Sequence, residues 1–273
     1  MTIEVQGQLA TTNGTTLYYE RAGAGETLVL VHGGGGDRRH WDEQFGELAR
    51  DFDVLRYDLR GFGKSSNPIE EAPYRHEDDL HELMVLLGIS RAHFAGFSLG
   101  SQIVVDAYTL YPEMFKSIVA VGPYVSGYSS PASEHLFNAF GRCGKTFQKS
   151  GAQGAAEDFV NIPAFNPEHI HDGVKERVMQ IAGEYSWWWA THRDPMVSVT
   201  PVATTKLDAI DVPVLTVTAE YDATVCREVA ALMQQRIASH VGIDVAGASH
   251  FMLLEKPVEV NTSIRKFLQK LGA

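Results

Sequence analysis

Short, uninterrupted apolar runs recur along this chain and alternate with segments of helical periodicity. The run Thr27–Val31 (TLVLV) has the length and the branched side chains that are typical of a strand buried on both faces. Residues 76–87 instead repeat apolar side chains every three or four positions, as one face of a helix does. By these criteria we expect strands at 17–21, 27–31, 53–57, 92–95, 117–121, 214–218 and 241–245, and helices at 76–87, 99–110 and from 257 onward.

Strands and helices that alternate along a chain indicate right-handed crossovers and a mostly parallel sheet. We therefore predict an α/β fold with a mostly parallel eight-stranded sheet flanked by helices. Residues 125–205 break the alternation, because they have helical and aromatic character but no clear strand. We interpret them as an insertion that covers one end of the sheet, within a core made of residues 1–124 and 206–273.

Charge and hydropathy exclude several classes of partner. The chain has 273 residues and a net charge of −11, which argues against nucleic acid, since that binding depends on Lys and Arg neutralising phosphates. The same charge disfavours anionic membranes, and no apolar run approaches the roughly 18 residues that a membrane helix needs. We expect neither a nucleic-acid nor a membrane partner.

The cysteines and the N-terminus bear on the compartment. Nothing in the sequence pairs Cys143 with Cys226, and two free buried thiols suit a reducing environment. Residues 1–10 lack the basic and apolar regions of a signal peptide. We therefore expect a cytoplasmic protein; a homodimer is compatible with the sequence.

The first candidate for chemistry is Ser98. It is the central residue of the pattern G-x-S-x-G at 96–100, which follows a predicted strand and opens a predicted helix. The strand must turn sharply into the helix, so side chains at Gly96 or Gly100 would collide with neighbouring backbone. The turn would present the Ser98 hydroxyl at the positive end of the helix dipole, as a nucleophile. The alternative is an ordinary serine cap of a helix.

A serine hydroxyl is a weak nucleophile until a base takes its proton. His250 is the candidate base, because it lies just after the last predicted strand, in a loop that can reach back over the sheet edge to Ser98. A histidine of an ordinary surface loop is the alternative.

A third group must hold the imidazole and stabilise its positive charge. Asp222 closely follows the strand at 214–218, and the order serine, aspartate, histidine is the order of nucleophile-elbow enzymes. Glu220 is the nearest rival, although its position suggests a role at the sheet end. Asp208 and Asp211 precede the strand and so belong to the opposite end of the sheet.

An oxyanion in the reaction would need backbone donors. We expect one to be the amide of Leu99 and the other to come from the glycine run after His32, with Gly34 as first choice and Gly35 next. A phosphate-binding loop is the alternative, but neither the P-loop pattern nor a dinucleotide fingerprint with its acidic partner is present. His32 is expected to shape this loop rather than to transfer protons.

Together these motifs resemble the α/β-hydrolase superfamily, and in particular its small esterases, lactonases and carbon–carbon bond hydrolases. The resemblance covers about residues 15–270 and implies that the loop D-x-R-G-x-G-x-S at 58–65 is structural. Haloalkane dehalogenases and epoxide hydrolases of the superfamily place aspartate at the nucleophile, so Ser98 disfavours those activities. The four glycines at 33–36 depart from the usual loop, where a bulky residue follows H-G, which leaves the second oxyanion donor open.

The resemblance further implies that residues 125–205 form a helical cap over the active site. Consecutive helical residues point about 100° apart, so one or two side chains of the run 187–189 (WWW) could line an apolar pocket; packing within the cap is the alternative. His169 and His171 with Asp172 lack a further ligand cluster, so we expect no metal, and the reaction needs no cofactor. The residues expected to contact substrate are Trp187, Trp188, Tyr124 and Phe251.

The leading functional hypothesis is hydrolysis of a small carboxylic ester or lactone through an acyl-enzyme. Carbon–carbon bond hydrolysis and cofactor-free perhydrolysis are alternatives that would use similar machinery. A ligand-binding or signalling receptor is the alternative of another class, because a fold does not fix a function.

Overall fold

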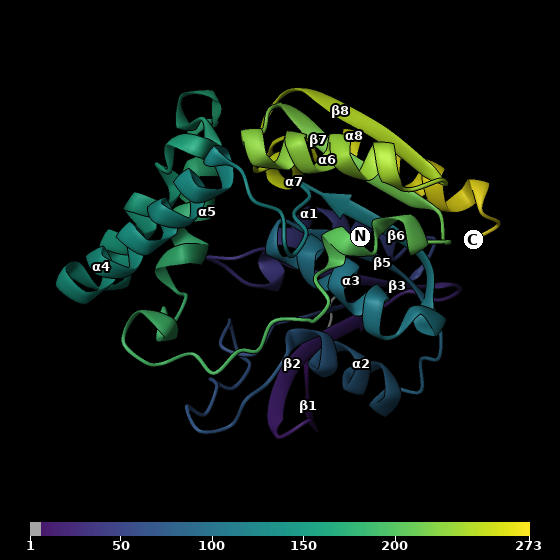
Figure 1. The fold of residues 1–273 in the computed structure, drawn as a ribbon, viewed down its shortest axis with the longest axis horizontal. Coiled ribbons are helices and arrows are strands. Elements are labelled where there is room, and N and C mark those ends of the chain that lie inside the picture. Colours follow the sequence, from purple (N-terminus) through teal and green to yellow (C-terminus); the bar gives the residue numbers. More distant parts are fainter. Residues whose placement is uncertain (1–6) are drawn as a thin grey trace.

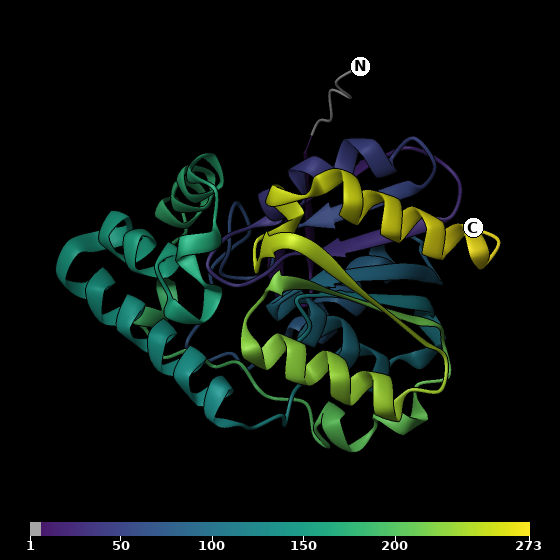
Figure 2. The ribbon, with the colours of Figure 1, turned by 90° about the horizontal axis from the view of Figure 1, so that it is seen from above.

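The computed structural model describes residues 7–273, and one eight-stranded sheet runs through its centre (Figures 1 and 2). The strands lie in the order β1-β2-β4-β3-β5-β6-β7-β8; β1 and β2 run antiparallel to their neighbours and the other pairs are parallel. This confirms the predicted fold class. The strands are β1 (Gln8–Thr12), β2 (Thr15–Ala22), β3 (Thr27–Val31), β4 (Asp53–Tyr57), β5 (Ala92–Phe97), β6 (Phe115–Val121), β7 (Val214–Tyr221) and β8 (His240–Ser249).

The hydrophobic pattern does not predict the edge strands of the sheet correctly. It predicts no strand at β1, of whose five residues only one is buried. Asn13 and Gly14 form the two-residue turn between β1 and β2, both with positive φ (46° and 68°), as tight hairpins require. The other edge strand, β8, extends beyond the predicted 241–245. Only three of its ten residues are buried, so no apolar run marks its ends.

Helices cover both faces of the sheet (Figure 2). One face carries α1 (Asp42–Leu48) and α8 (Pro257–Lys270), which contact each other. The opposite face carries α2 (His76–Leu86), α3 (Leu99–Leu110) and α6 (Thr224–Arg236). The short helix α7 (Met252–Glu255) leads from β8 into α8.

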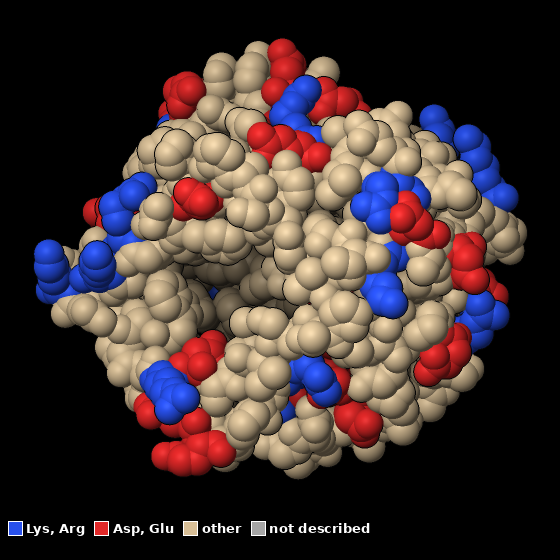
Figure 3. Space-filling view, viewed as in Figure 1, with Lys and Arg blue, Asp and Glu red and all other residues tan. Residues whose placement is uncertain are grey.

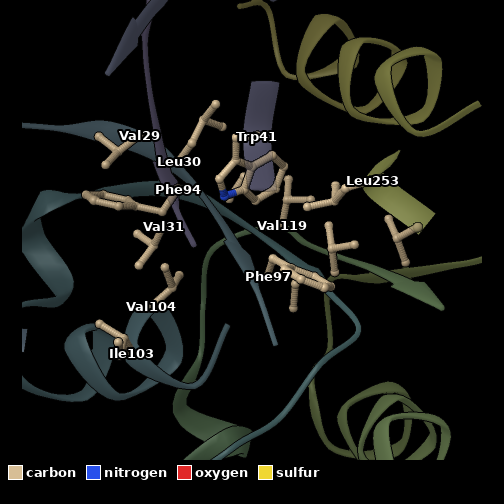
Figure 4. Close-up of a cluster of buried hydrophobic side chains, with 14 of the residues drawn as sticks. Val29, Leu30, Val31, Trp41, Phe94, Phe97, Ile103, Val104, Val119 and Leu253 are labelled. Atoms are coloured by element: carbon tan, nitrogen blue, oxygen red, sulfur yellow. The ribbon is translucent and has the colours of Figure 1, made fainter. Parts of the chain in front are cut away.

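The core lies on both sides of the central strands (Figure 4). Strand β3 is buried almost completely and packs against Ile103 and Val104 of α3 on one side. On the other side lie Trp41 and Leu253, which are also fully enclosed. Burying one such large side chain contributes about 1.5–3 kcal/mol to the stability of the fold. This packing holds the central strands in place.

Two helices, α4 (Pro131–Val160) and α5 (Asp172–Gly183), pack on each other beside the sheet (Figure 1). The hydroxyl of Ser130 caps α4 by accepting the amide hydrogen of Ser133. Gly151, with φ 71° and ψ −171°, interrupts α4, which is therefore two helices across a kink. The division into a core and a cap at 125–205 stays a prediction.

Two further expectations concern composition. Cys143 and Cys226 are both free and buried. None of the helices within residues 7–273 combines the length and apolar character that crossing a membrane requires. The expectation about a signal peptide rests on residues 1–10, of which 1–6 lie outside the described residues.

Candidate active site

Ser98 stands on a sharp turn between β5 and α3. Its backbone has φ 52° and ψ −113°, a conformation that residues with side chains rarely adopt and that costs on the order of 1–3 kcal/mol. Its amide donates a hydrogen bond to the carbonyl oxygen of Val121 (2.9 Å), which anchors the turn to the end of β6. The Ser98 side chain stays partly exposed and lines a cavity.

The glycines on either side of Ser98 are required by close backbone contacts. A Cβ atom at Gly96 would lie 2.3 Å from the carbonyl oxygen of Gly100. A Cβ atom at Gly100 would lie 2.2 Å from the carbonyl oxygen of Val31. Both contacts are with backbone, which cannot move aside, so the pattern G-x-S-x-G follows from packing of the elbow.

His250 and Asp222 are in direct contact. His250 follows β8, Asp222 follows β7, and the imidazole Nδ1 lies 2.7 Å from the carboxylate Oδ1. Both side chains are almost completely buried, and Oδ1 also accepts the amide hydrogen of Ala223 (2.8 Å). Because a carboxylate only accepts hydrogen bonds, Nδ1 carries the proton, which leaves Nε2 free to act as a base.

The turn after β6 brings His250 close to the elbow. The imidazole occupies the space of a missing side chain, since a Cβ atom at Gly122 would lie 2.8 Å from its Cε1. The preceding residue, Val121, accepts the amide hydrogen bond of Ser98. The ring of Phe97 also packs on the imidazole, with centroids 5.0 Å apart. Ser98 and His250 therefore flank the same short turn.

The rival carboxylates have other partners. Glu220 accepts the amide hydrogen of Gly247 (2.9 Å) and is exposed at the sheet end. Asp208 pairs with Arg236, and Asp211 accepts the hydroxyl hydrogen of Tyr108 (2.6 Å). Asp222 alone of these four contacts His250 among the described interactions.

His32 is fixed by the backbone on both sides of its ring. Leu59 donates its amide hydrogen to Nε2 (3.0 Å), so Nδ1 carries the proton and donates to the carbonyl oxygen of Gly33 (2.8 Å). Burial lowers the pKa of His32, so the ring is neutral. With both nitrogens engaged, His32 holds the glycine loop to the loop after β4.

The four glycines after His32 are not equivalent. A Cβ atom would lie 2.8 Å from the Phe97 ring at Gly33, 2.5 Å from the Phe159 ring at Gly35 and 2.4 Å from the His40 ring at Gly36. At Gly34 the nearest atom would be 3.8 Å away, on Leu99. Gly34 thus lies open to the cavity beside Leu99, the two residues expected to supply the oxyanion donors.

A cavity of about 260 Å³ opens above Ser98, and Figure 3 shows it as a hollow with a mostly uncharged rim. Helix α4 contributes Phe137 and Phe140 to its wall, and Phe62 stacks on Tyr185 at another side. The expected contact residues Tyr124, Trp187 and Trp188 line it as well, although Trp187 is fully enclosed. The prediction for Phe251 is wrong, because Phe251 is not among the described residues that line the cavity. It packs against Phe159 and Phe165 instead.

The two basic side chains among the described residues that line the cavity, Arg60 and His76, present no free positive charge. Arg60 forms an ion pair with Asp79 (2.6 Å) and lies over the ring of Tyr74, 4.5 Å from its centroid. Burial lowers the pKa of His76 to about 3, so this imidazole is uncharged. No sequence pattern predicts that Arg60 and His76 line the cavity, because this depends on how separate segments of the chain meet.

Comparison with known proteins identifies a family and a partial relative. The family model described as "Alpha/beta hydrolase family" matches residues 28–262. A protein of Pseudomonas savastanoi pv. phaseolicola, provisionally named a carbamate hydrolase, is 37% identical over 114 residues, so the match spans 41% of this chain and 43% of that protein.

Solved structures share the fold over almost the whole chain. A thermophilic esterase from Thermogutta terrifontis matches with a TM-score of 0.79 at 24% identity, covering 98% of this chain and 100% of that one. The enol-lactonase from Burkholderia xenovorans LB400 matches with a TM-score of 0.77 at 21% identity, covering 96% and 100%. At these identities the likeness establishes the fold alone.

Proposed function

This chain belongs to the alpha/beta hydrolase family, and we propose that it is a serine hydrolase that cleaves a small carboxylic ester or lactone through an acyl-enzyme. Ser98, His250 and Asp222 are its catalytic triad. The observation that carries the proposal is the buried 2.7 Å contact between His250 and Asp222 beside the turn that holds Ser98.

In the proposed reaction the Ser98 hydroxyl attacks the substrate carbonyl while Nε2 of His250 takes its proton. Asp222 stabilises the resulting imidazolium through Nδ1. The oxyanion accepts hydrogen bonds from the amides of Leu99 and Gly34. His250 then protonates the leaving alcohol, and a water molecule activated by the same imidazole releases the acid.

The cavity narrows the substrate class. Its volume of about 260 Å³ and its aromatic walls suit a small, uncharged, largely apolar acyl or ring group. The provisional name of the Pseudomonas relative favours carbamates as a second class, since a carbamate carbonyl would use the same nucleophile and oxyanion donors. A cytoplasmic location, inferred from two unpaired buried cysteines, remains part of this proposal.

Hydrolysis of p-nitrophenyl butanoate tests the proposal. Wild-type protein should turn the ester over, and Ser98→Ala should lower kcat at least about 10³-fold. Ser263→Ala, at a partly exposed position of α8 outside the cavity lining, is the matched control and should keep the wild-type rate. Labelling by a fluorophosphonate probe should likewise require Ser98.

Two results would contradict the proposal. Equal turnover by the Ser98→Ala variant would remove the nucleophile. Tight binding of esters or lactones without turnover and without fluorophosphonate labelling would instead favour the receptor alternative.

A further inference from the structure

We propose that Asp222, Cys226 and His250 form an inhibitory binding site for a thiophilic divalent cation such as Zn²⁺ or Cd²⁺. The inhibitory effect rests on the proposed hydrolase function, whereas the binding itself does not. Within residues 7–273, these three side chains form the one group of three or more potential metal ligands.

The potential ligand atoms already lie close together. The Cys226 Sγ is 3.9 Å from the His250 Nδ1, which is 2.7 Å from the Asp222 Oδ1, and the three ligand atoms all lie within 4.8 Å of one another. Tetrahedral zinc bonds of about 2.0–2.3 Å place neighbouring ligand atoms roughly 3.3–3.6 Å apart. Lengthening the His250–Asp222 contact by roughly half an ångström would therefore admit an ion.

One carboxylate oxygen of Asp222 is available as a further metal ligand. The Asp222 Oδ2 is buried and has no hydrogen-bond partner among the described residues, which is an uncommon state for a carboxylate oxygen. The Cys226 thiol is also almost fully buried, with its Sγ 3.9 Å from the His250 Nδ1. A bound cation would be the charge that makes a thiolate favourable in this buried place.

Cys226 also provides the route of access. It lies in the first turn of α6 and lines the same cavity as Ser98, whereas Asp222 and His250 are not among the lining residues. On the other side of the imidazole, the ring of Phe165 stacks on His250 with centroids 4.6 Å apart. An ion would thus arrive from the cavity and meet the thiol first.

Binding would block the reaction by changing the state of His250. The ion takes Nδ1, the proton of that nitrogen moves to Nε2, and the Cys226 thiol loses its proton to solvent as the metal–sulfur bond forms. One proton is released for each ion bound. Because Nε2 then carries a proton, it cannot accept the proton of Ser98.

Titration of the full-length protein with CdCl₂ tests the binding. Calorimetry should show one site, ultraviolet absorption should show the thiolate-to-cadmium charge-transfer band, and about one proton should be released per ion. Cys226→Ser and Cys226→Ala should both lose the band and weaken binding at least ~10-fold, since hard ligands hold soft ions poorly. Cys143→Ser, which changes the other buried cysteine, should behave as wild type, and MgCl₂ should not bind at this site.

The activity readout is separate. If the wild-type protein hydrolyses p-nitrophenyl butanoate, Cd²⁺ or Zn²⁺ should inhibit it, a chelator should reverse the inhibition, and each Cys226 variant should need at least ~10-fold more metal relative to its own metal-free rate. Thermal melting of each variant establishes that it is folded. Binding and charge-transfer absorption unchanged in both folded Cys226 variants, or no binding in wild type, would overturn the site. Binding without any ester hydrolysis would leave the site standing and refute the hydrolase.

Discussion

Neighbouring residues of the same type in this protein can have very different surroundings. Among the four glycines after His32, a Cβ atom would meet an aromatic ring at less than 3 Å at three, and only Gly34 has room for one. The sequence shows four identical letters, so it could rank Gly34 and Gly35 as oxyanion donors only by position. What distinguishes Gly34 from Gly35 is the neighbour of each, Leu99 and Phe159, and both neighbours lie far along the chain.

Alanine substitutions should separate these roles. Gly35→Ala places a Cβ atom 2.5 Å from the Phe159 ring at φ +70°, and should destabilise the fold by about 1–3 kcal/mol. Gly34→Ala makes only ordinary contacts and should melt near the wild-type temperature while lowering kcat/KM more for bulky than for acetate esters. Thermal melting and ester kinetics check both, and equal melting temperatures for the two variants would refute the distinction.

His40 makes stability depend on pH. It is buried, neither ring nitrogen has a hydrogen-bond partner among residues 7–273, and burial lowers its pKa from 6.5 to about 3. Between those values the unfolded chain binds a proton that the folded chain does not, so this residue's contribution is complete above pH 6.5 and is lost as pH falls toward 3.

His40→Leu removes that linkage. When the pH is lowered from 7.5 to 5, the free energy of unfolding should fall less in the variant than in wild type. The difference between the two falls should be on the order of 1–2 kcal/mol. Urea unfolding at both pH values measures it, with His135→Leu as control, because His135 is exposed and keeps its hydration on folding. Parallel pH dependence in wild type and His40→Leu would show the assignment to be wrong.

Whole elements were predictable where both faces of a strand are buried. Strand β3 and strand β4 begin and end at the expected residues because their runs are continuously apolar or enclosed. Strands β1 and β8 are edge strands whose solvent faces carry polar residues, so no apolar run marks their ends. The placement of Ser98, Asp222 and His250 at one edge of the sheet could be predicted, because each directly follows a strand and parallel strands end at the same edge.

Helix α4 offers a matched pair of glycines. Gly151 and Gly141 are both exposed, and a Cβ atom at either would meet nothing within 4 Å, so backbone conformation alone distinguishes them. Gly151→Ala should destabilise by about 1–3 kcal/mol because its φ of 71° and ψ of −171° suit glycine only. Gly141→Ala, in regular helix, should stabilise by roughly 0.5–1 kcal/mol. Chemical denaturation measures both; a shift of the same sign would contradict the kink as the cause.

At the scale of the whole molecule, the shape of the cavity could not be predicted from the sequence. Its wall combines the loop that holds Arg60, helix α4 and the segment around Trp187, so its shape depends on how distant parts meet. Arg60 is the one Lys or Arg side chain among the described lining residues, and Asp79 already neutralises it. An anionic substrate would therefore find no free positive charge.

A pair of esters checks this consequence. Mono-p-nitrophenyl adipate should have a kcat/KM at least ~10-fold below that of its neutral methyl ester, because an unpaired carboxylate would be buried in an apolar cavity. The two acyl groups are closely similar in shape, so the comparison isolates charge. Equal or faster hydrolysis of the anion would refute the assignment of an uncharged substrate class.

The missing side chain of Gly122 makes the alignment of His250 sensitive to a position without a chemical role. The imidazole fills the volume that any larger residue would claim, and the neighbouring carbonyl of Val121 anchors the elbow. A substitution at Gly122 would therefore act in two ways: it would strain a backbone whose φ is 52°, and it would displace the imidazole of His250, the proposed base.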